Sequence, residues 1–350
     1  MMNHFERVMA AIERRPVDRF PTDIWCVPEV RQRLLDYCGT TEWVRVLDAL
    51  DIDGIIGLWP KYIGPALPDL GENLRQDEWG RVWRKQEYNN GIYWEQVGYP
   101  LAQAETIADL DAYRWPDPAW YDYASLPDIA AEYPGRVIEV GYTAVFYYHN
   151  MLRGLELSMM DLALRPEFSH HLIRRLADWF YEYHERCFAA MGAKVQITQV
   201  TDDFGSQTGL LISKGMIEEY YRPWIERAIA QAKGHGIKVF HHDDGAIYSL
   251  IPDLIEMGID VLNPIQWRCK GMDRQAIGEN FGGKLCFHGG VDNQYTLPFG
   301  TPEDVRQEVA YNLSTLGRTG TGYIIAPCHN IQNNTPLENI LALYQAPRVL

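Results

Sequence analysis

Histidine, aspartate and cysteine side chains gather at four places in this chain where short β-branched segments end. These places are Thr201-Asp202-Asp203, His241-His242-Asp243-Asp244, His288-Gly289-Gly290-Val291-Asp292 and Pro327-Cys328-His329-Asn330. Four of the ten histidines lie in the last three of them. If the segments are parallel strands of a barrel, their carboxyl ends meet on one face, and the side chains form one candidate site.

Spacing sorts these residues into sets that share a face. His242 and Asp244 are two residues apart, so along a strand their side chains point the same way, while those of His241 and Asp243 point the other way. The pattern does not tell which pair faces inward. Together with Cys328 from a neighbouring strand, His242 and Asp244 offer nitrogen, oxygen and sulfur ligands to zinc and leave a fourth position open, as catalytic zinc requires.

A structural explanation stays open beside this one. Asp244 precedes Gly245 and can cap the helix that follows, Asp202 and Asp203 can cap a turn, and Cys328 can be a buried apolar thiol. The six cysteines form no CxxC pair and have no regular spacing. We therefore expect reduced thiols and a cytoplasmic protein.

Eight short strands are predicted to position these side chains. Each runs into a polar or glycine-containing turn and then a helical stretch, and they lie at 20–25, 52–57, 137–141, 195–201, 238–242, 260–265, 285–289 and 323–326. Strands that alternate with helices imply parallel pairing, and eight such units favour a closed (β/α)8 TIM barrel over an open doubly wound sheet. We expect residues 1–350 to form this single barrel domain.

Helix signals in the second half of the chain support the alternation. Apolar residues spaced by three or four predict a helix over 166–191. Thr301 and Thr335 are each followed by proline, so each is predicted to cap a helix, the second with a capping box. Ser213 is predicted to cap a helix that ends near 234–236.

Residues 59–118 interrupt the alternation of strands and helices. The segment is rich in Trp, Tyr, Gly and Asn, and its middle, from 78 to 100, alternates like a hairpin around an Asn-Asn-Gly turn. Its aromatic content argues against disorder. We predict a long insertion after the second strand that lies over the barrel mouth.

Composition excludes several classes of function. The net charge is −15 and no stripe of Lys and Arg is present, which argues against a duplex nucleic acid ligand. The first twenty residues lack the apolar run of a signal peptide, and no apolar stretch is long enough to span a bilayer. The motifs GxGxxG, GxxxxGK[ST], GxSxG and HExxH are all missing, so dinucleotide, P-loop, serine-hydrolase and thermolysin-like chemistry has no motif support.

Longer segments carry a family resemblance. In the C-terminal half they are TDDFGSQTGLLISKGMIEEYYRPW, KVFHHDDG, IEMGIDVLNPIQ, LCFHGGVDNQYTLPFGTPEDV and GYIIAPCHNIQNNTPLENILALY, and earlier ones are RRPVDRFPTDIW, DEWGRVW, YPLA and RWPDP. They resemble the uroporphyrinogen decarboxylase superfamily, and more closely its branch of cobalamin-dependent methyltransferases, which act on methanol, methylamine, methylthiol or aryl methyl ethers. The resemblance covers nearly the whole chain and implies a (β/α)8 barrel.

The methyltransferases of this branch are similar to one another in a zinc motif of His-x-Cys followed far downstream by a second Cys. In this chain the matching positions are His242, Asp244 and Cys328, so a carboxylate stands where the first thiolate would be. A carboxylate is a harder ligand than a thiolate. The departure therefore favours an oxygen-bound substrate, such as an ether or an alcohol, over a thiol.

The resemblance to true uroporphyrinogen decarboxylases is weaker near the N-terminus. Those enzymes carry an Arg-Gln-x-Gly-Arg segment after the first strand and a catalytic Asp in a Phe-Ser-Asp context. Here the corresponding stretches read WCVPEVRQRL and IIGLWPKY. A substrate with eight acid groups needs several fixed cations, so decarboxylation of a porphyrinogen is not expected.

The resemblance implies a function for the whole site. We expect methyl transfer from a small, O-methylated donor to the cobalamin of a partner corrinoid protein, because the chain has no room for its own corrinoid domain. Asp203 and Gln207 are candidates for orienting substrate or a metal ligand, and His288 and His329 for the general acid. Tyr147 and Trp59 are candidate substrate-binding residues, and a homodimer is compatible with the sequence.

Two rival hypotheses stay open. The first is a metal-independent decarboxylase or lyase acting on another acid, which requires a cation in the mouth; Arg153 and Lys61 are the candidates. The second is a barrel that binds a ligand or partner without catalysis. The density of ionisable groups at the strand ends argues against the second, because burying such groups costs stability unless they are used.

Overall fold

A parallel sheet of seven strands, curled into half a barrel, forms the centre of the molecule in the computed structural model, which describes residues 1–88 and 91–348. The strand order is β1-β7-β8-β9-β10-β11-β12, and every neighbouring pair is parallel. The bounds are β1 Ile55–Leu58, β7 Val137–Thr143, β8 Ile197–Val200, β9 Lys238–His242, β10 Val261–Asn263, β11 Cys286–His288 and β12 Tyr323–Ile324. This α/β arrangement agrees with the predicted TIM-like fold.

Seven of the eight predicted strand segments overlap one of these strands, and the first does not. In the segment 20–25, Thr22 forms only an isolated parallel bridge to Ile325, and its carbonyl accepts a hydrogen bond from Gly54 N–H. Pro21 has no N–H to donate to a strand ladder, which works against a regular strand here. The segment therefore touches both edges of the sheet without forming a strand of its own.

Alternate residues of each strand face the barrel interior in two layers. The lower layer is apolar and packs against Val8, Ala11 and Ile12 of α1 (His4–Ile12); it consists of Ile55, Val137, Ile197, Phe240, Val261, Cys286 and Ile324. Two positions further along the same faces lie Gly57, Glu139, Gln199, His242, Asn263 and His288. The carboxyl end of the barrel thus has a mostly polar lining.

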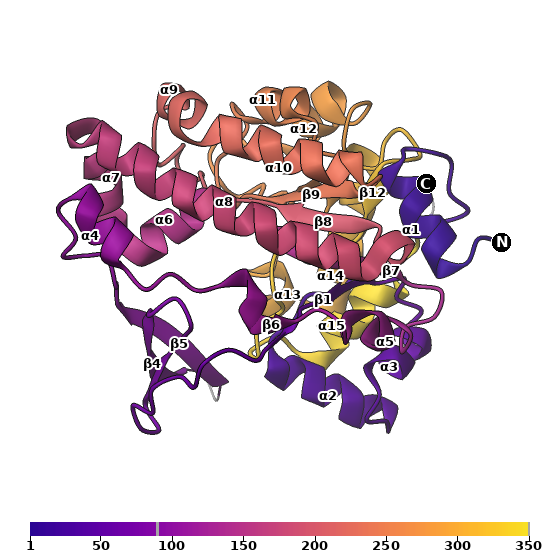
Figure 1. Cartoon of the computed structure of the whole chain (residues 1–350). Coiled ribbons are helices and arrows are strands. Elements are labelled where there is room, and N and C mark those ends of the chain that lie inside the picture. The colour runs from indigo at the N-terminus through magenta and orange to yellow at the C-terminus, as the bar shows by residue number, and fades with distance from the viewer. Residues whose placement is uncertain (89–90, 349–350) are drawn as a thin grey trace.

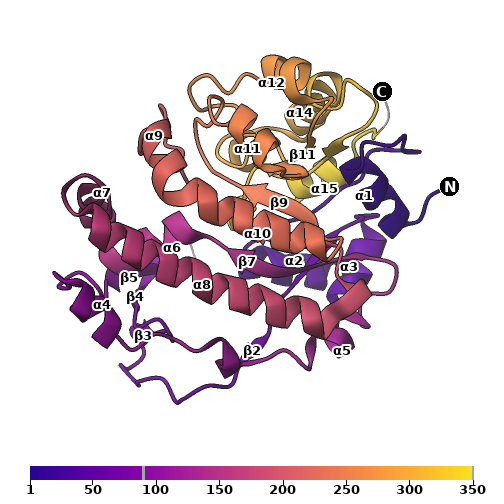
Figure 2. The ribbon, with the colours of Figure 1, turned by 45° about the horizontal axis from the view of Figure 1, so that its top comes forward.

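Helices cover the outside of the sheet. The long helices α8 (Pro166–Met191) and α10 (Arg222–Gly234) lie side by side and contact β7, β8 and β9 (Figures 1 and 2). The others are α2 Pro28–Cys38, α3 Trp43–Ala49, α5 Leu126–Ala130, α6 Val145–Arg153, α7 Leu155–Leu164, α9 Lys214–Met216, α11 Ile251–Met257, α12 Arg274–Phe281, α13 Thr296–Phe299, α14 Pro302–Thr315 and α15 Leu337–Gln345. Short 3-10 turns at Pro118–Trp120 and Gly192–Lys194 and a π turn at Ile217–Tyr221 complete the set.

The aromatic segment after β1 contains two small antiparallel sheets. β2 (Lys61–Tyr62) pairs with β6 (Tyr121–Asp122), and β3 (Leu74–Gln76), β4 (Val82–Tyr88) and β5 (Gly91–Gly98) form a three-stranded sheet, followed by α4 (Ile107–Ala112). The predicted hairpin is confirmed, and the first two residues of its Asn-Asn-Gly turn lie outside the described residues. Figure 1 shows β4 and β5 at the side of the molecule away from both termini.

Trp79 anchors this segment to the body of the protein. Its side chain is almost completely buried, and its ring lies 4.6 Å from that of Trp179 on α8 and 4.8 Å from that of Tyr148 on α6. Gln96 of β5 donates a hydrogen bond to the carbonyl of Met151, and Ile92 N–H donates to Glu29 of α2. The hairpin is thus fixed at two separate helices.

Three of the predicted helix starts are confirmed and one is wrong. Helix α8 begins at Pro166, Thr301 caps α14 in a capping box with Asp304, and Ser213 accepts a hydrogen bond from Met216 N–H at the start of α9. Thr335 does not cap α15, whose first turn bonds to the Pro336 carbonyl instead.

All six cysteines are free thiols. Within residues 1–88 and 91–348, no helix is both long and apolar enough to cross a bilayer.

Candidate active site

A cavity of about 730 Å³ opens at the carboxyl ends of the strands, and we call it the mouth cavity. Aromatic rings and carboxyl groups dominate its wall. Its lining consists of Asp23, Ile24, Trp25, Cys26, Arg31, Trp43, Ile55, Ile56, Gly57, Leu58, Trp59, Tyr133, Glu139, Tyr142, Tyr147, Gln199, Asp203, Phe240, His242, His329 and Asn330. The predicted site residues Trp59, Tyr147, Asp203, His242 and His329 all lie here.

A chain of hydrogen bonds fixes the orientation of His242. Its Nδ1 lies 2.6 Å from Asn263 Oδ1, and the Asn263 amide nitrogen lies 2.8 Å from His288 Nδ1. His288 Nε2 in turn lies 2.9 Å from Asp23 Oδ2. Since Asn263 Oδ1 can only accept, His242 carries its proton on Nδ1. The lone pair of Nε2 then faces the carboxyl groups of Asp203 and Asp244.

Three side chains converge as a possible metal site. His242, Asp244 and His329 each offer a ligand atom, and these atoms lie within 4.8 Å of one another. Asp244 is held by Gln266, whose amide nitrogen donates to Asp244 Oδ1 at 2.7 Å while its oxygen accepts from Gly245 N–H. Two imidazoles and a carboxylate form a donor set that catalytic zinc accepts.

The protonation of this group depends on its burial. Burial raises the pKa of Asp244, and the nearby imidazoles of His242 and His329 oppose that effect. Burial and the proximity of His242 lower the pKa of His329. Asn330 N–H donates to His329 Nδ1 at 2.7 Å, so the proton of the neutral His329 ring lies on Nε2, and binding a metal through Nε2 would require this hydrogen bond to be given up. Neutral imidazoles are the form in which histidine binds a metal.

Cys328, the predicted third ligand, lies outside this group. Its thiol is buried, and Sγ lies 3.4 Å from the carbonyl oxygen of Ile265. Burial raises the pKa of this thiol well above the ordinary value. β12 ends at Ile324, so the alternation of a strand does not extend to 328, and the loop directs the next residue, His329, into the cavity. Cys328 is therefore not among the three side chains that converge.

Two other candidates occupy positions that differ from the expected ones. Gln207 does not line the mouth cavity but lies in the exposed loop beyond β8, where its oxygen accepts a weak hydrogen bond from the Cys269 thiol. His288 is fully buried, is hydrogen-bonded to Asn263 and Asp23, and does not line the mouth cavity. Asp203, by contrast, lies 3.8 Å from His242 Nε2.

The structure shows which of the two His-Asp pairs at the end of β9 is open to the site. His242 and Asp244 are the partly exposed pair, with 14% and 35% of their side chains accessible, whereas those of His241 and Asp243 are fully buried. His241 Nδ1 bonds to the Val200 carbonyl, and burial lowers its pKa to about 4. Asp243 accepts from the N–H groups of Phe204 and Gly205. The second pair therefore ties β9 to its neighbours.

Several polar residues of the site were missed by the sequence analysis. They are Asp23, Glu139, Gln199, Asn263 and Gln266, which fall in or beside predicted strands. A signal was present in the sequence, because Glu139 and Asn263 are strongly polar residues inside otherwise apolar strands. Glu139 is almost completely buried, and its Oε1 accepts a hydrogen bond from Gln199 Nε2 at 2.7 Å.

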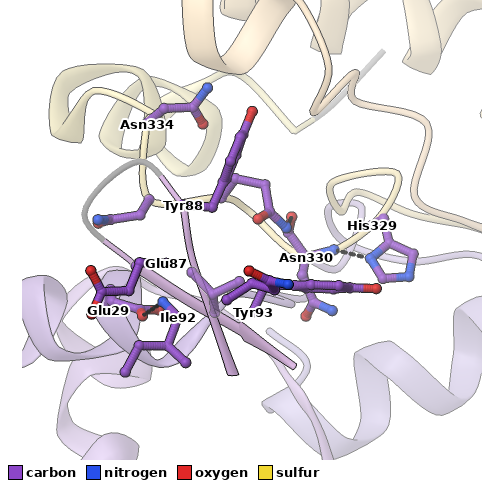
Figure 3. A pocket seen from close by; sticks show the side chains of 13 residues that line it. Glu29, Glu87, Tyr88, Ile92, Tyr93, His329, Asn330 and Asn334 are labelled. Carbon is purple, nitrogen blue, oxygen red and sulfur yellow. Dashed lines mark hydrogen bonds between the residues drawn. The ribbon is translucent and has the colours of Figure 1, made fainter. Parts of the chain in front are cut away.

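A second cavity of about 740 Å³, the hairpin cavity, adjoins the first. It lies between the hairpin and the loop after β12 and is lined by Val27, Glu29, Gln86, Glu87, Tyr88, Gly91, Ile92, Tyr93, His329, Asn330, Gln332, Asn333 and Asn334. Figure 3 shows Tyr93 of the hairpin reaching toward Asn330 and His329. Because His329 and Asn330 line both cavities, the two spaces meet at the proposed metal group.

The two cations suggested for a decarboxylase are not in the mouth cavity. Arg153 is buried and paired with Asp161 at 2.8 Å, and Lys61 is an exposed residue of β2. Arg31 lines the cavity instead, with its guanidinium 4.4 Å from the ring centre of Trp43. Of the described residues that line the mouth cavity, Arg31 is the only Arg or Lys.

The family model and the curated relatives that match this chain carry the same description. The family model described as uroporphyrinogen decarboxylase (URO-D) matches residues 103–349. A uroporphyrinogen decarboxylase of Pseudomonas syringae pv. tomato is 28% identical over 258 residues, covering 69% of this chain and 68% of the relative. One of Anaeromyxobacter dehalogenans is 25% identical over 364 residues, covering 97% of each. A methyltransferase structure from Methanosarcina mazei aligns with a TM-score of 0.63 at 16% identity, covering 98% of this chain and 97% of that one.

Proposed function

This chain belongs to the uroporphyrinogen decarboxylase family, and from that premise we propose that it is a methyltransferase. It transfers a methyl group from a small O-methyl donor to the cobalamin of a partner corrinoid protein. The observation that carries the proposal is the group of His242, Asp244 and His329 at the edge of an aromatic cavity. The likeness in fold to a methyltransferase along almost the whole chain supports it.

Zinc is the metal we propose for this group, with His242, Asp244 and His329 as ligands. When bound, zinc would withdraw negative charge from the oxygen that leaves the methyl group. Asn263 holds the lone pair of His242 Nε2 toward the group, and Gln266 holds the carboxylate of Asp244. Fixing ligands through such partners is how proteins tune metal sites.

The remaining residues of the mouth cavity position the donor and limit water. Trp59 and Tyr142, with ring centres 5.7 Å apart, form one aromatic wall, and Tyr147 lies beside them. Asp203 is 39% exposed and close to His242, so it can accept a proton or a hydrogen bond from a bound alcohol. Aromatic walls with few polar groups are typical of sites for small organic ligands.

We propose that the hairpin cavity is the approach for the corrinoid partner. A two-substrate transfer needs two access routes to one reacting centre, and the two cavities meet at His329. We also propose that residues 1–350 form one barrel domain, in which 20–25 takes the place of the eighth strand and 59–118 is an insertion over the mouth.

A decarboxylase acting on another carboxylic acid is the second candidate. It is favoured by the curated relatives, which are uroporphyrinogen decarboxylases, and by Arg31, which forms no ion pair among the described residues. A porphyrinogen with eight acid groups would require more than this single cation. The substrate of such an enzyme would therefore be a smaller acid.

A methyl-transfer assay separates the two candidates. Purified protein is incubated with cob(I)alamin and either methanol or methoxybenzenes, and methylcobalamin is followed by its absorbance. We expect turnover in the wild type, its loss in His242→Ala and His329→Ala, and its retention in Arg31→Ala. Metal analysis should give about one zinc per chain, lost in His329→Ala and kept in Cys328→Ala.

The opposite results would overturn the proposal. Release of carbon dioxide from added acids, abolished by Arg31→Ala, would favour the decarboxylase. Zinc that is lost in Cys328→Ala but kept in His329→Ala would restore Cys328 as the ligand. A protein that takes up no zinc after zinc is added back would exclude the proposed metal site.

A further inference from the structure

A carboxyl group without a charged partner lies in the wall of the mouth cavity. Glu139 is the upper inward residue of β7, and 7% of its surface is accessible. Its Oε1 accepts the hydrogen bond from Gln199, and Oε2 forms no hydrogen bond with any of the residues that the structure describes. Since Glu139 lines the cavity, Oε2 is the atom available to a ligand.

A structural role does not account for this residue. Packing would be served as well by a leucine, and burying a carboxyl with a single hydrogen bond costs stability. The neighbours do not offer a cation: Gly57 of β1 lies against Oε1, and Gln199 of β8 is neutral. Buried ionisable groups of this kind, in a cleft and without a structural partner, are candidates for a function.

We propose that Glu139 contacts the substrate: its carboxyl, held in the neutral form, donates a hydrogen bond from Oε2 to an oxygen atom of the methyl donor. Gln199 orients the group by occupying Oε1, which leaves the proton on Oε2. Glu139 thus selects donors that carry an ether, hydroxyl or carbonyl oxygen as an acceptor. The inference rests on the proposed function only in taking the mouth cavity as the donor site.

The electrostatic environment supports the neutral form. Burial raises the pKa of Glu139 to about 8, and the charge of Asp23 acts in the same direction, while the hydrogen bond from Gln199 opposes them. The titratable groups that share the cavity are Asp23, Cys26, Arg31, Tyr133, Tyr142, Tyr147, Asp203, His242 and His329. Arg31 is the one permanent cation of this set, and no ion pair joins it to Glu139 in the described chain.

Binding of 1,2-dimethoxybenzene, which has acceptor oxygens and no proton to lose, tests the proposal. Calorimetry compares the wild type with Glu139→Gln, which keeps a donor, and Glu139→Leu, which removes it. We expect Glu139→Gln to bind within about threefold of the wild type and Glu139→Leu to bind more than about tenfold more weakly. Binding to the wild type should weaken above pH 8, whereas binding to Glu139→Gln should not.

Infrared spectroscopy gives a readout that needs no turnover. The carbonyl stretch of a protonated carboxyl should be present in the wild type at pH 7, absent in Glu139→Gln, and shifted by 1,2-dimethoxybenzene. Equal binding by all three proteins, lack of binding by the wild type, or weak binding by Glu139→Gln would overturn the proposal. If Glu139→Leu does not fold, the pH profiles of the other two decide. Binding without methyl transfer would instead count against the proposed function alone.

Discussion

His242 reaches the mouth cavity because β9 ends on it and because Phe240, two residues earlier, faces the barrel interior. Asp244 lies two residues beyond the end of β9, and a hydrogen bond from Gln266 holds it near His242. Behind His242, Asn263 occupies the last inward position of β10 and connects it to His288 and Asp23. Strand ends that are adjacent in the sheet therefore supply both the ligand and the residue that orients it.

Asn263 should act as a positioning residue for the metal group. In Asn263→Ala, Nδ1 of His242 loses its acceptor, so the ring is free to rotate and to change tautomer. We expect the zinc affinity to fall by about 10- to 100-fold, as for other partners of metal ligands. Competition with a chelating dye measures it. Asn280→Ala, which removes an exposed amide bonded to Tyr248, is the control. Equal zinc affinities in the two variants would show that the hydrogen bond to Asn263 does not orient His242.

Glu139 should also make the stability of the protein depend on pH. Its folded pKa of about 8 lies above the ordinary value of 4.5, so the folded state holds the proton more tightly. The stabilisation is complete below pH 4.5 and is lost as the pH rises through 8. Between pH 5 and pH 8, the free energy of unfolding of the wild type should fall by about 3 kcal/mol relative to Glu139→Gln. Urea unfolding at both pH values measures the difference, and parallel profiles would contradict it.

At the scale of elements, alternation of strands and helices was enough to predict the sheet. Seven predicted segments overlap its strands, and the 238–242 strand has the predicted bounds. The 20–25 segment failed because a sequence does not show whether an extended stretch near a proline completes a ladder. The period of two predicts directions only inside a strand. Asp244 lies beyond the end of β9, where Gln266 holds it, and the predicted ligand Cys328 lies beyond the end of β12, so neither position was fixed by the alternation.

The residues that orient the site were harder to predict than the site itself. Asn263 and Gln266 each bond to a ligand residue about twenty positions earlier in the chain, on the preceding strand or the loop after it. Such contacts depend on the register between neighbouring strands, and one sequence does not fix that register. A polar residue in an apolar strand is the signal that was available for Asn263 and Glu139.

Close packing between two loops should control the position of Asp244. A Cβ added to Gly205 would lie 2.1 Å from the Asp244 carbonyl oxygen, so Gly205→Ala must push the loop after β9 away from the loop after β8. We expect weaker zinc binding and a loss of stability of about 1–3 kcal/mol. Gly209→Ala in the same loop is the matched control, because an added Cβ there has nothing within 4 Å. Calorimetric zinc titration of both variants measures the effect, and identical affinities would contradict it.

At the scale of the whole molecule, the two ends of the barrel have different tasks. The carboxyl ends carry the mouth cavity, while α1 covers the amino ends with an apolar face. Just before β1, the fully buried Asp53 accepts hydrogen bonds from Arg7 and Arg19 and from the Thr22 N–H. In barrel enzymes this end serves stability and the opposite end serves chemistry.

Asp53→Asn should therefore weaken the fold without changing the site. Removing the charge leaves the Arg7 guanidinium, only 6% accessible, without one of its two carboxylates, and Arg19 and His4 lose the same partner. Breaking a buried ion pair in this way costs about 3–5 kcal/mol. Asp51→Asn is the control: Asp51 is 60% exposed and also pairs with Arg19, so its loss should cost less than about 1 kcal/mol. Urea unfolding gives both values, and zinc stoichiometry at low temperature should stay unchanged in both proteins. A lower zinc content in folded Asp53→Asn would show that the two ends of the barrel are energetically coupled.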